Sequence, residues 1–396
     1  MDTIKNLFAG LKTQSRVESI DLLRGIVIVL MALDHTRDFF SIVHFNPVDL
    51  TQTNAGYFFT RWITHICAPV FVFLAGTSAF LYGQRAPSKN DLSKFLFTRG
   101  LWLVFLEFTL VRWGWQFNWD YSYSWVQVIW ALGISMIVLS VLIYLPNKWI
   151  ALFGIGMILF HNTFDGIKAD ELGSFRWLWL FLHEEGIITF GENGIFWITY
   201  PLVPWIGVMA AGYVFGQLYL LPEKERNRYL LRIGSFLTIL FFVIRGINIY
   251  GDPQQWSVQN NFLFSVLSFL NCEKYPPSLS FLLMTLGPSI LLLAFLDKLK
   301  KGIKNFFLVF GRTPLFFYLI HVPVIHFFSV MLAVWMGYDT TFHFNNSDPA
   351  TWPVGFGFNL PGIYAVWIFI VLLLYPLCKW FAKLKAEKKN KWLSYL

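Results

Sequence analysis

The sequence predicts an all-α, polytopic integral membrane bundle of ten to eleven transmembrane helices, with both termini in the cytoplasm. The first observation is composition: 56% of the 396 residues are hydrophobic and only 14% are charged, whereas soluble domains are about one quarter charged. The second is that the apolar residues fall into long runs, and the third is that most basic residues flank these runs on one side. Together these observations exclude a disordered chain, a disulfide scaffold and an ordinary cytosolic enzyme.

Most of the predicted spans approach or exceed the roughly 20 residues that cross a hydrocarbon core. Because backbone groups find no water in lipid, these spans must be helical. The fifth span is the weakest, since its apolar stretch ends near Phe160, and the short run Arg176–Leu182 is expected on the outer surface. In chain order, the ten spans cover residues 22–42, 58–82, 99–118, 124–145, 149–164, 194–220, 230–250, 278–296, 314–335 and 361–382.

The distribution of Lys and Arg predicts the orientation. With residues 1–19 placed inside, 22 of the 31 Lys and Arg residues lie on the inner side and three lie on the outer side. Such an excess is typical of cytoplasmic loops. The chain therefore divides into a cytoplasmic segment 1–19 without a cleavable signal, a transmembrane domain 20–382 and a basic cytoplasmic tail 383–396 near anionic lipid headgroups.

The cysteines and the net charge exclude other classes. Cys67, Cys272 and Cys378 are far apart and form no CxxC or Cys/His pattern, so neither a disulfide framework nor a metal site is predicted. The net charge of +8 follows the flanks of the apolar runs. It is therefore interpreted as a topology signal rather than as a nucleic-acid-binding surface.

The first span carries ionisable residues, which are costly in a membrane and therefore indicate function. Arg24 and His35 are eleven residues apart, about 16 Å along a helix, so His35 would lie near the middle of the bilayer. His35 and Asp38 share a helix face, as do Asp34 and Arg37. An imidazole held by a carboxylate can act as a general base. The alternative is a polar helix end that solvates these groups.

Two more histidines could face the same cavity. His65 in the second span lies at a depth similar to that of His35, and His44 lies in the first outer loop. The structural alternative for His65 is a packed ring bonded to a backbone carbonyl. The small residues of Ala75–Ala79 predict close packing of the second span against another helix.

Glu107 and Arg245 are further ionisable residues within predicted spans. Either could bind substrate. Alternatively, Glu107 is paired inside the bundle and the Arg245 side chain extends to the outer interface.

The tetrapeptide Gly311–Pro314 predicts a helix start, with Thr313 as the N-cap and proline at the first helical position. The positive end of this helix would face the cytoplasm beside Arg312 and near Lys304, an arrangement that favours anion binding. Positive-inside anchoring is the alternative. His321 lies about 10 Å further along the helix, where it would approach the cavity from the inner side.

The motifs that are missing limit the chemistry. The sequence contains no HExxH motif, nucleophile elbow, Walker loop or GxGxxG fingerprint. The loop 165–193, predicted to lie outside, is rich in Asp and Glu. A buried cavity with candidate bases, an inner anion site and this acidic outer loop would suit transfer of an activated group from a cytoplasmic anionic donor to an outer acceptor. The alternatives are a transporter of a small anionic or sugar-like solute, favoured by Pro- and Gly-interrupted spans, and a scaffold protein without chemistry.

Several segments also carry a family resemblance. The opening Arg16–Gly25 with the pair Asp34 and His35, and the later stretch His65–Ser78, resemble the catalytic-domain family of heparan-α-glucosaminide N-acetyltransferases. Similarity to bacterial members is seen in Tyr275–Leu279, Met284–Pro288 and Gly311–His321.

This resemblance implies an acetyl-CoA-dependent N- or O-acetyltransferase of a bacterial inner membrane that modifies a sugar or glycan on the outer side. Related membrane acyltransferases that O-acetylate polysaccharides place a catalytic His eleven residues after an Arg, as Arg24 and His35 do here. The lysosomal branch has its proposed active His near the first luminal loop, where His44 stands in this chain. Both histidines therefore remain candidates for the base.

The resemblance also implies roles for the remaining candidates. No metal and no nucleic acid are expected, and an oligomer is possible. The donor phosphates would lie near Arg312, Thr313, Arg99 and Lys304. The tetrahedral oxyanion of acyl transfer needs hydrogen-bond donors, and the candidates are Arg24, His321 and His65.

Overall fold

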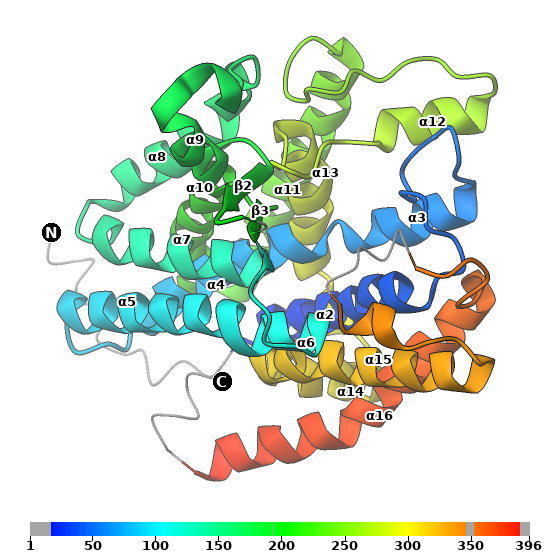
Figure 1. The fold of residues 1–396 in the computed structure, drawn as a ribbon. Helices are drawn as coiled ribbons and strands as arrows, with labels where there is room; N and C mark the ends of the chain where they lie inside the picture. Colours follow the sequence, from blue (N-terminus) through cyan, green and yellow to red (C-terminus); the bar gives the residue numbers. More distant parts are fainter. Residues whose placement is uncertain (1–16, 193, 346–351, 389–396) are drawn as a thin grey trace, which may run out of the picture.

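The computed structural model describes residues 17–192, 194–345 and 352–388 (Figure 1). Helices dominate these residues, which confirms the predicted helical membrane protein in its coarse form. Five helices are long and apolar enough to cross a membrane, or six if a bent pair is counted as one span. Ten to eleven spans are not confirmed by this count. Most of the predicted N-terminal segment and of the basic tail lies outside the described residues.

All five candidate spans overlap predicted ones, although their ends differ. The last of them continues past residue 382, so the predicted boundary between membrane domain and tail falls inside a helix. They are α3 with α4 (Ala55–Thr64 and Cys67–Gly83), α10 with the turn that follows it (Leu202–Phe215 and Gly216–Leu220), α11 (Glu223–Ile247), α15 (Pro314–Met336) and α16 (Leu360–Glu387).

The other helices are shorter than a bilayer-crossing helix or carry charges. The chain bends by 111° between Asn147–Phe164 and Ala169–Leu182, so α9 does not continue the axis of α8. Two helices, α12 and α14, were not predicted; α14 has Lys301 and Lys304 near its start, and its apolar run Phe306–Phe310 is too short to indicate a membrane span. These shorter helices are α5 (Lys89–Leu106), α6 (Arg112–Gln116), α7 (Val128–Leu142), α8 (Asn147–Phe160), α9 (Arg176–Leu182), α12 (Phe262–Leu270), α13 (Leu279–Leu293) and α14 (Lys301–Arg312).

The charged first helix, α2 (Glu18–Phe40), lies inside the bundle. It packs against α4, α14, α15 and α16, and most of its residues are buried (Figure 1). Gly25 and Gly311 let α2 and α14 cross with their backbones in contact, because a Cβ at either glycine would overlap the facing backbone. The surrounding helices therefore shield the ionisable residues of α2 from lipid.

The small residues of the second predicted span pack closely, as the sequence indicates. Gly76 of α4 and Gly212 of α10 each face the backbone of the other helix at a spacing that leaves no room for a Cβ. The Thr77 hydroxyl donates to the Gly212 carbonyl over 3.0 Å. This contact fixes α4 beside α10.

Two strands of a three-stranded sheet lie at positions where the sequence predicted the starts of helical spans. Strand β1 (Tyr123–Val126) pairs in parallel with β3 (Gly194–Ile198), and β2 (Gly186–Phe190) pairs with β3 in antiparallel fashion. The predicted starts at residues 124 and 194 are therefore wrong. A short apolar run can be a buried strand as well as part of a helix, and periodicity alone does not separate the two.

Glu107 and Arg245 are used by the fold itself. The Glu107 carboxylate accepts the backbone N–H groups of Gln127 and Trp130 at 3.1 and 2.9 Å, at the start of α7. The Arg245 guanidinium donates to four carbonyls of the neighbouring loops and pairs with Asp252 at 3.5 Å. Both side chains hold helix and loop ends together.

Candidate functional site

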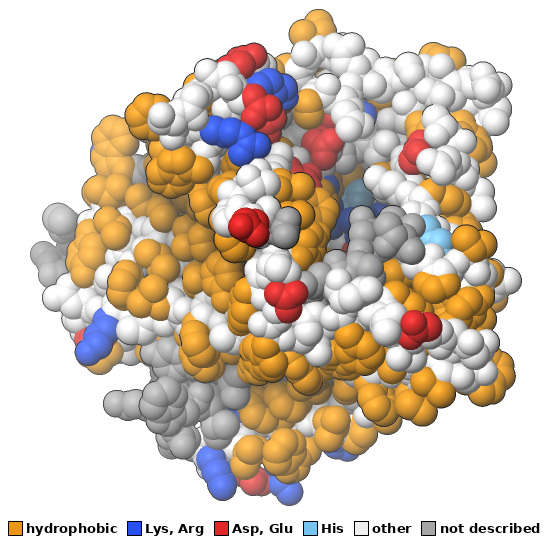
Figure 2. Space-filling model, viewed as in Figure 1, with side chains coloured by type: hydrophobic (Ala, Val, Ile, Leu, Met, Phe, Trp, Pro, Cys, Tyr) orange, Lys and Arg blue, Asp and Glu red, His pale blue; other side chains and the backbone are white. Residues whose placement is uncertain are grey.

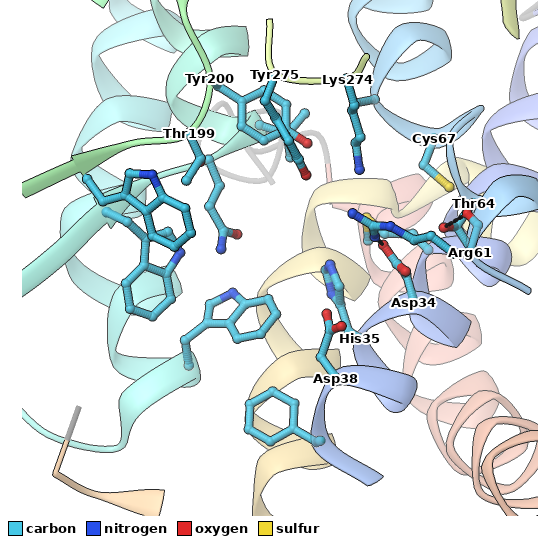
Figure 3. A pocket seen from close by; sticks show the side chains of 18 of the residues that line it. Asp34, His35, Asp38, Arg61, Thr64, Cys67, Thr199, Tyr200, Lys274 and Tyr275 are labelled. Atoms are coloured by element: carbon cyan, nitrogen blue, oxygen red, sulfur yellow. Dashed lines mark hydrogen bonds and ion pairs between the residues drawn. The ribbon is translucent and has the colours of Figure 1, made fainter. Parts of the chain in front are cut away.

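A cavity of about 520 Å³, called the outer cavity below, opens at the C-terminal end of α2, the end that the sequence predicts to face the outside. Figure 2 shows it as a hollow in a largely apolar face, with charged side chains visible inside. In the close view of Figure 3, Asp34, His35 and Asp38 project from α2, and Lys274 and Tyr275 face them across the cavity. Aromatic side chains complete the wall, among them Trp115, Trp125, Trp197 and Trp352.

His35 is bonded to His321 behind the cavity wall. Its Nδ1 lies 2.7 Å from Nε2 of His321, and the two rings are stacked with centroids 4.9 Å apart. His35 is partly accessible and lines the cavity, whereas His321 is fully buried. We expected His35 and His321 to approach one cavity from opposite sides. The contact between the two rings agrees with this expectation.

The hydrogen positions in the histidine pair follow from its partners. His321 Nδ1 lies 3.0 Å from the Phe317 carbonyl and 2.7 Å from the Tyr318 carbonyl. Carbonyl oxygens only accept, so Nδ1 of His321 carries its hydrogen and Nε2 is the acceptor. His35 must then donate from Nδ1 to His321. The free lone pair of His35 therefore lies on Nε2, the nitrogen that is left to act as a base.

The carboxylates of α2 pair with arginines rather than with His35. Asp34 pairs with Arg37 at 2.8 Å, as its i,i+3 spacing predicts, and it also pairs with Arg61 of α3. Arg37 reaches Asp38 at 2.6 Å. Among the described residues, no hydrogen bond joins His35 to Asp34 or Asp38. The predicted carboxylate partner of His35 is thus replaced by His321.

The outer rim adds one carboxyl group with unusual acidity. Burial raises the pKa of Glu185 to about 7, and the nearby Glu273 carboxylate acts in the same direction. Glu185 and Lys274 line the cavity together. The Lys274 ammonium lies 5.0 Å from the centre of the Tyr275 ring. Charge at this rim therefore changes near neutral pH.

A second cavity, of about 400 Å³ and called the inner cavity below, lies toward the N-terminal end of α2, which the sequence predicts to face the cytoplasm. Its charged lining is wholly basic among the described residues, and the rest of its wall is mainly apolar. Residues near the start of α2 and near the end of α16 both line this cavity. The basic residues are Arg24, Arg99, Arg312 and Lys385.

A basic groove continues from this inner cavity. The groove, of about 670 Å³, lies between α14 and α16 and shares Arg312 and Lys385 with the cavity. Lys379 and Lys383 of α16 add two more cations. The sequence analysis assigned Lys383, in the basic tail, to lipid headgroups and gave no role to Lys379. A signal was available: Lys379 and Lys383 are four residues apart and so share a helix face.

The two cavities share part of their walls. Phe71 of α4, Val128 of α7 and Tyr318 of α15 line both cavities. Tyr318 stands one turn before His321 on the same helix, with ring centroids 5.6 Å apart. The histidine pair thus lies beside the thin partition between an outer aromatic cavity and an inner basic one.

The predicted site residues divide between these places. His44 lines the outer cavity with His35, whereas Arg24 lines the inner one, where it donates to Asp21 at 3.1 Å and to Ser78. His65 is buried against Phe281 and lines neither cavity.

The expected anion site is only partly assembled. The helix α15 starts at Pro314 as predicted, but Thr313 makes no side-chain cap. Thr313 is fully buried, and its hydroxyl donates to the Val309 carbonyl over 3.0 Å. Lys304 pairs with Glu18 at 2.7 Å. Neither residue lines the inner cavity, whereas Arg99 and Arg312 do.

Two comparisons with known proteins bear on the chain. The family model described as heparan-alpha-glucosaminide N-acetyltransferase, catalytic, matches residues 16–250. No curated protein was found to match the chain. The family match covers α2 to α11, and therefore includes His35, both cavity-lining arginines of α2 and α5, and the shared-wall residues Phe71 and Val128.

Proposed function

The chain belongs to the family of heparan-alpha-glucosaminide N-acetyltransferase catalytic domains, and from this premise we propose that it moves an acetyl group from acetyl-CoA to a sugar. It is an integral membrane acetyltransferase of that family. In our proposal the donor enters the inner cavity from the cytoplasm. The acceptor is a hydroxyl or amine of a sugar or glycan in the outer cavity, and the membrane is a bacterial inner membrane.

The inner cavity has the chemistry that the donor requires. The phosphates of CoA are anionic, and Arg and Lys are the residues that bind such groups. Arg312 and Lys385 lie where the inner cavity joins the basic groove, so we assign the phosphates to this junction. The apolar wall of the cavity then suits the uncharged thioester arm, which would point toward the partition.

The single observation that carries the proposal is the meeting of two unlike cavities beside a histidine pair. A basic inner cavity and an aromatic outer cavity share Phe71, Val128 and Tyr318, and His35 faces the outer side of this partition. Group transfer across the membrane needs donor and acceptor to meet at one place with a base in reach. The shared wall and the histidine pair beside it support such a meeting place.

His35 supplies the base in the proposed reaction. Nε2 takes the proton from the acceptor hydroxyl or amine as that group attacks the thioester carbonyl carbon. The new C–O or C–N bond forms, the tetrahedral intermediate collapses and the C–S bond breaks. The imidazolium of His35 returns the proton to the departing CoA thiolate, which leaves as the thiol.

The outer cavity suits a sugar ring. Its wall combines large aromatic surfaces with a few polar groups, which is the usual composition of a small-molecule site. Trp115, Trp125 and Trp197 offer apolar faces, while Glu185 and Lys274 offer hydrogen bonds and charge. The volume of about 520 Å³ offers room for a small saccharide.

Acetyl transfer by the purified protein tests the proposal directly. The protein in nanodiscs is mixed with labelled acetyl-CoA and a panel of free sugars and amino sugars, and the products are read by mass spectrometry. His35→Ala should lower the transfer rate by about 10²- to 10⁴-fold, the usual contribution of a positioned base. It should leave the affinity for CoA unchanged in calorimetric titration.

His44→Ala serves as the comparison variant. His44 lines the same cavity, and its Nε2 has no hydrogen-bond partner among the described residues. Loss of transfer in His44→Ala with near-normal transfer in His35→Ala would move the base to His44. Absence of CoA binding and of acetyl transfer, together with uptake of a sugar or small anion into proteoliposomes, would establish a transporter and overturn the proposal.

A further inference from the structure

Tyr318 occupies a place that the reaction proposed above leaves without an assigned residue. It lies on α15, is 5% exposed and lines both the inner and the outer cavity. The other two residues of the shared wall, Phe71 and Val128, have no polar side-chain atom. Tyr318 therefore provides the only side-chain hydroxyl that the described partition offers to a thioester arriving from the inner cavity.

The Tyr318 hydroxyl has no hydrogen-bond partner among the described residues. Leaving a buried hydroxyl unpaired costs about 1–3 kcal/mol, and most such groups in proteins are paired. An unpaired hydroxyl beside a cavity is therefore a group that a bound ligand can satisfy. Its position one turn from His321 places it next to the histidine pair that handles the proton.

We propose that the Tyr318 hydroxyl donates a hydrogen bond to the oxygen of the acetyl carbonyl and stabilises the oxyanion of the tetrahedral intermediate. The inference rests on the proposed acetyl transfer. When the acceptor attacks, the C=O π electrons move onto oxygen, and the Tyr318 O–H points its dipole at the new charge without giving up its proton. The acceptor proton passes to His35, and the re-formed carbonyl later expels the CoA thiolate.

The residues expected to hold the oxyanion are placed less favourably. Both ring nitrogens of His321 are already bonded, one to His35 and the other to backbone carbonyls. Arg24 lies in the inner cavity and is bonded to Asp21, Leu74 and Ser78. His65 lines neither cavity.

Trp115 is a competitor with a similar feature, because its ring also contacts that of His35. Its Nε1 is also buried without a partner, and its ring stands 5.0 Å from that of His35. However, Trp115 lines only the outer cavity, on the side of the acceptor. The thioester carbonyl reaches the partition from the inner side, so the structure favours Tyr318.

Replacing the hydroxyl alone provides the test. Tyr318→Phe should lower kcat by about 10²- to 10³-fold, the effect of removing one oxyanion donor. The affinity for CoA, which has no acetyl carbonyl, should change by less than about twofold in calorimetric titration, and the KM for the acceptor should stay constant. Tyr213→Phe is the matched control, because Tyr213 is a buried tyrosine of α10 that lines neither cavity.

The outcomes separate this inference from the proposed function. Transfer by the wild-type protein with near-normal kcat in Tyr318→Phe overturns the role of Tyr318 and leaves the function intact. Loss of CoA affinity in Tyr318→Phe also overturns it, since the residue would then act in donor binding. A loss of kcat in Trp115→Phe but not in Tyr318→Phe assigns the oxyanion to Trp115. Absence of transfer by the wild-type protein overturns the function and this inference together.

Discussion

Replacing His321 with leucine tests the hydrogen-bond chain behind His35. In the wild-type protein, His321 Nε2 accepts the Nδ1 hydrogen of His35 at 2.7 Å and so keeps the lone pair of His35 on Nε2. His321→Leu removes this acceptor. The Nδ1–H group then has no partner, or the hydrogen moves to Nε2 and the base is lost. We expect slower transfer with unchanged CoA affinity, because His321 lines neither cavity.

The expected size follows from the geometry. An unpaired buried donor costs about 1–3 kcal/mol, which corresponds to roughly 5- to 150-fold in rate at 1.4 kcal/mol per tenfold. His321→Leu should therefore lower kcat by about 10- to 10²-fold, which is less than His35→Ala. His321→Gln should recover part of the rate, since its amide oxygen can accept the His35 hydrogen.

Single-turnover transfer of labelled acetyl groups is the suitable assay, because it isolates the chemical step from product release. The control is His326→Gln on the same helix, since His326 bonds to the Gly114 carbonyl at 3.1 Å and lines neither cavity. A kcat for His321→Leu within about threefold of wild type would refute the reasoning. A larger loss in His321→Leu than in His35→Ala would make His321 the base.

Three further predictions concern the donor, the outer rim and the topology. Arg312→Ala should weaken CoA binding by about 1.5–3 kcal/mol, the range for a hydrogen bond to a charged group. Lys298→Ala is the control and should leave the affinity unchanged, because Lys298 is exposed and lines neither the inner cavity nor the basic groove. Equal affinities of the two variants for CoA in calorimetric titration would argue against the phosphate site. Glu185 has a pKa of about 7 in the folded protein, against an ordinary value of 4.5. As the pH rises, Glu185 therefore loses its proton in the unfolded chain before it does so in the folded protein. The free energy of unfolding then falls between pH 4.5 and 7, by at most about 1.4 kcal/mol per pH unit. Glu185→Gln should abolish this decline in melting temperature between pH 4.5 and 7, and parallel curves for both proteins would contradict the assignment. Reporter fusions at residue 396 and in loop 340–350 should report opposite sides of the membrane, and the same side for both would disprove the predicted orientation.

The sequence predicted best those features that depend on the geometry of a single helix. The pairing of Asp34 with Arg37 follows from i,i+3 spacing alone. The axial rise of a helix led us to expect His35 and His321 to approach one cavity from opposite sides on different spans, and the two rings are in contact. The start of α15 at Pro314 was readable for the same reason, since helix starts have local signals.

Features that depend on distant segments were not predictable. The partner of His35 is on a helix 286 residues away, while the nearby carboxylates that seemed suitable are held by Arg37 and Arg61. The sheet joins β1 to β3 across the long outer loop, and strand pairing of this kind leaves no local pattern. Tyr318 was missed because an aromatic residue in an apolar span looks like packing until both cavities are known.

The placement of α2 explains why its charges can be where they are. Charged groups at the centre of a lipid-facing helix cost several kcal/mol each, yet α2 carries Asp34, Arg37 and Asp38 within five residues. The other helices enclose α2, so these charges face one another and the outer cavity instead of lipid. The arginine pairs hold both carboxylates, which leaves His35 as the ionisable side chain of this cluster without an opposite charge bonded to it. The His35 ring is held by His321 instead of by a carboxylate, and its Nε2 lone pair is left to take the proton of the acceptor.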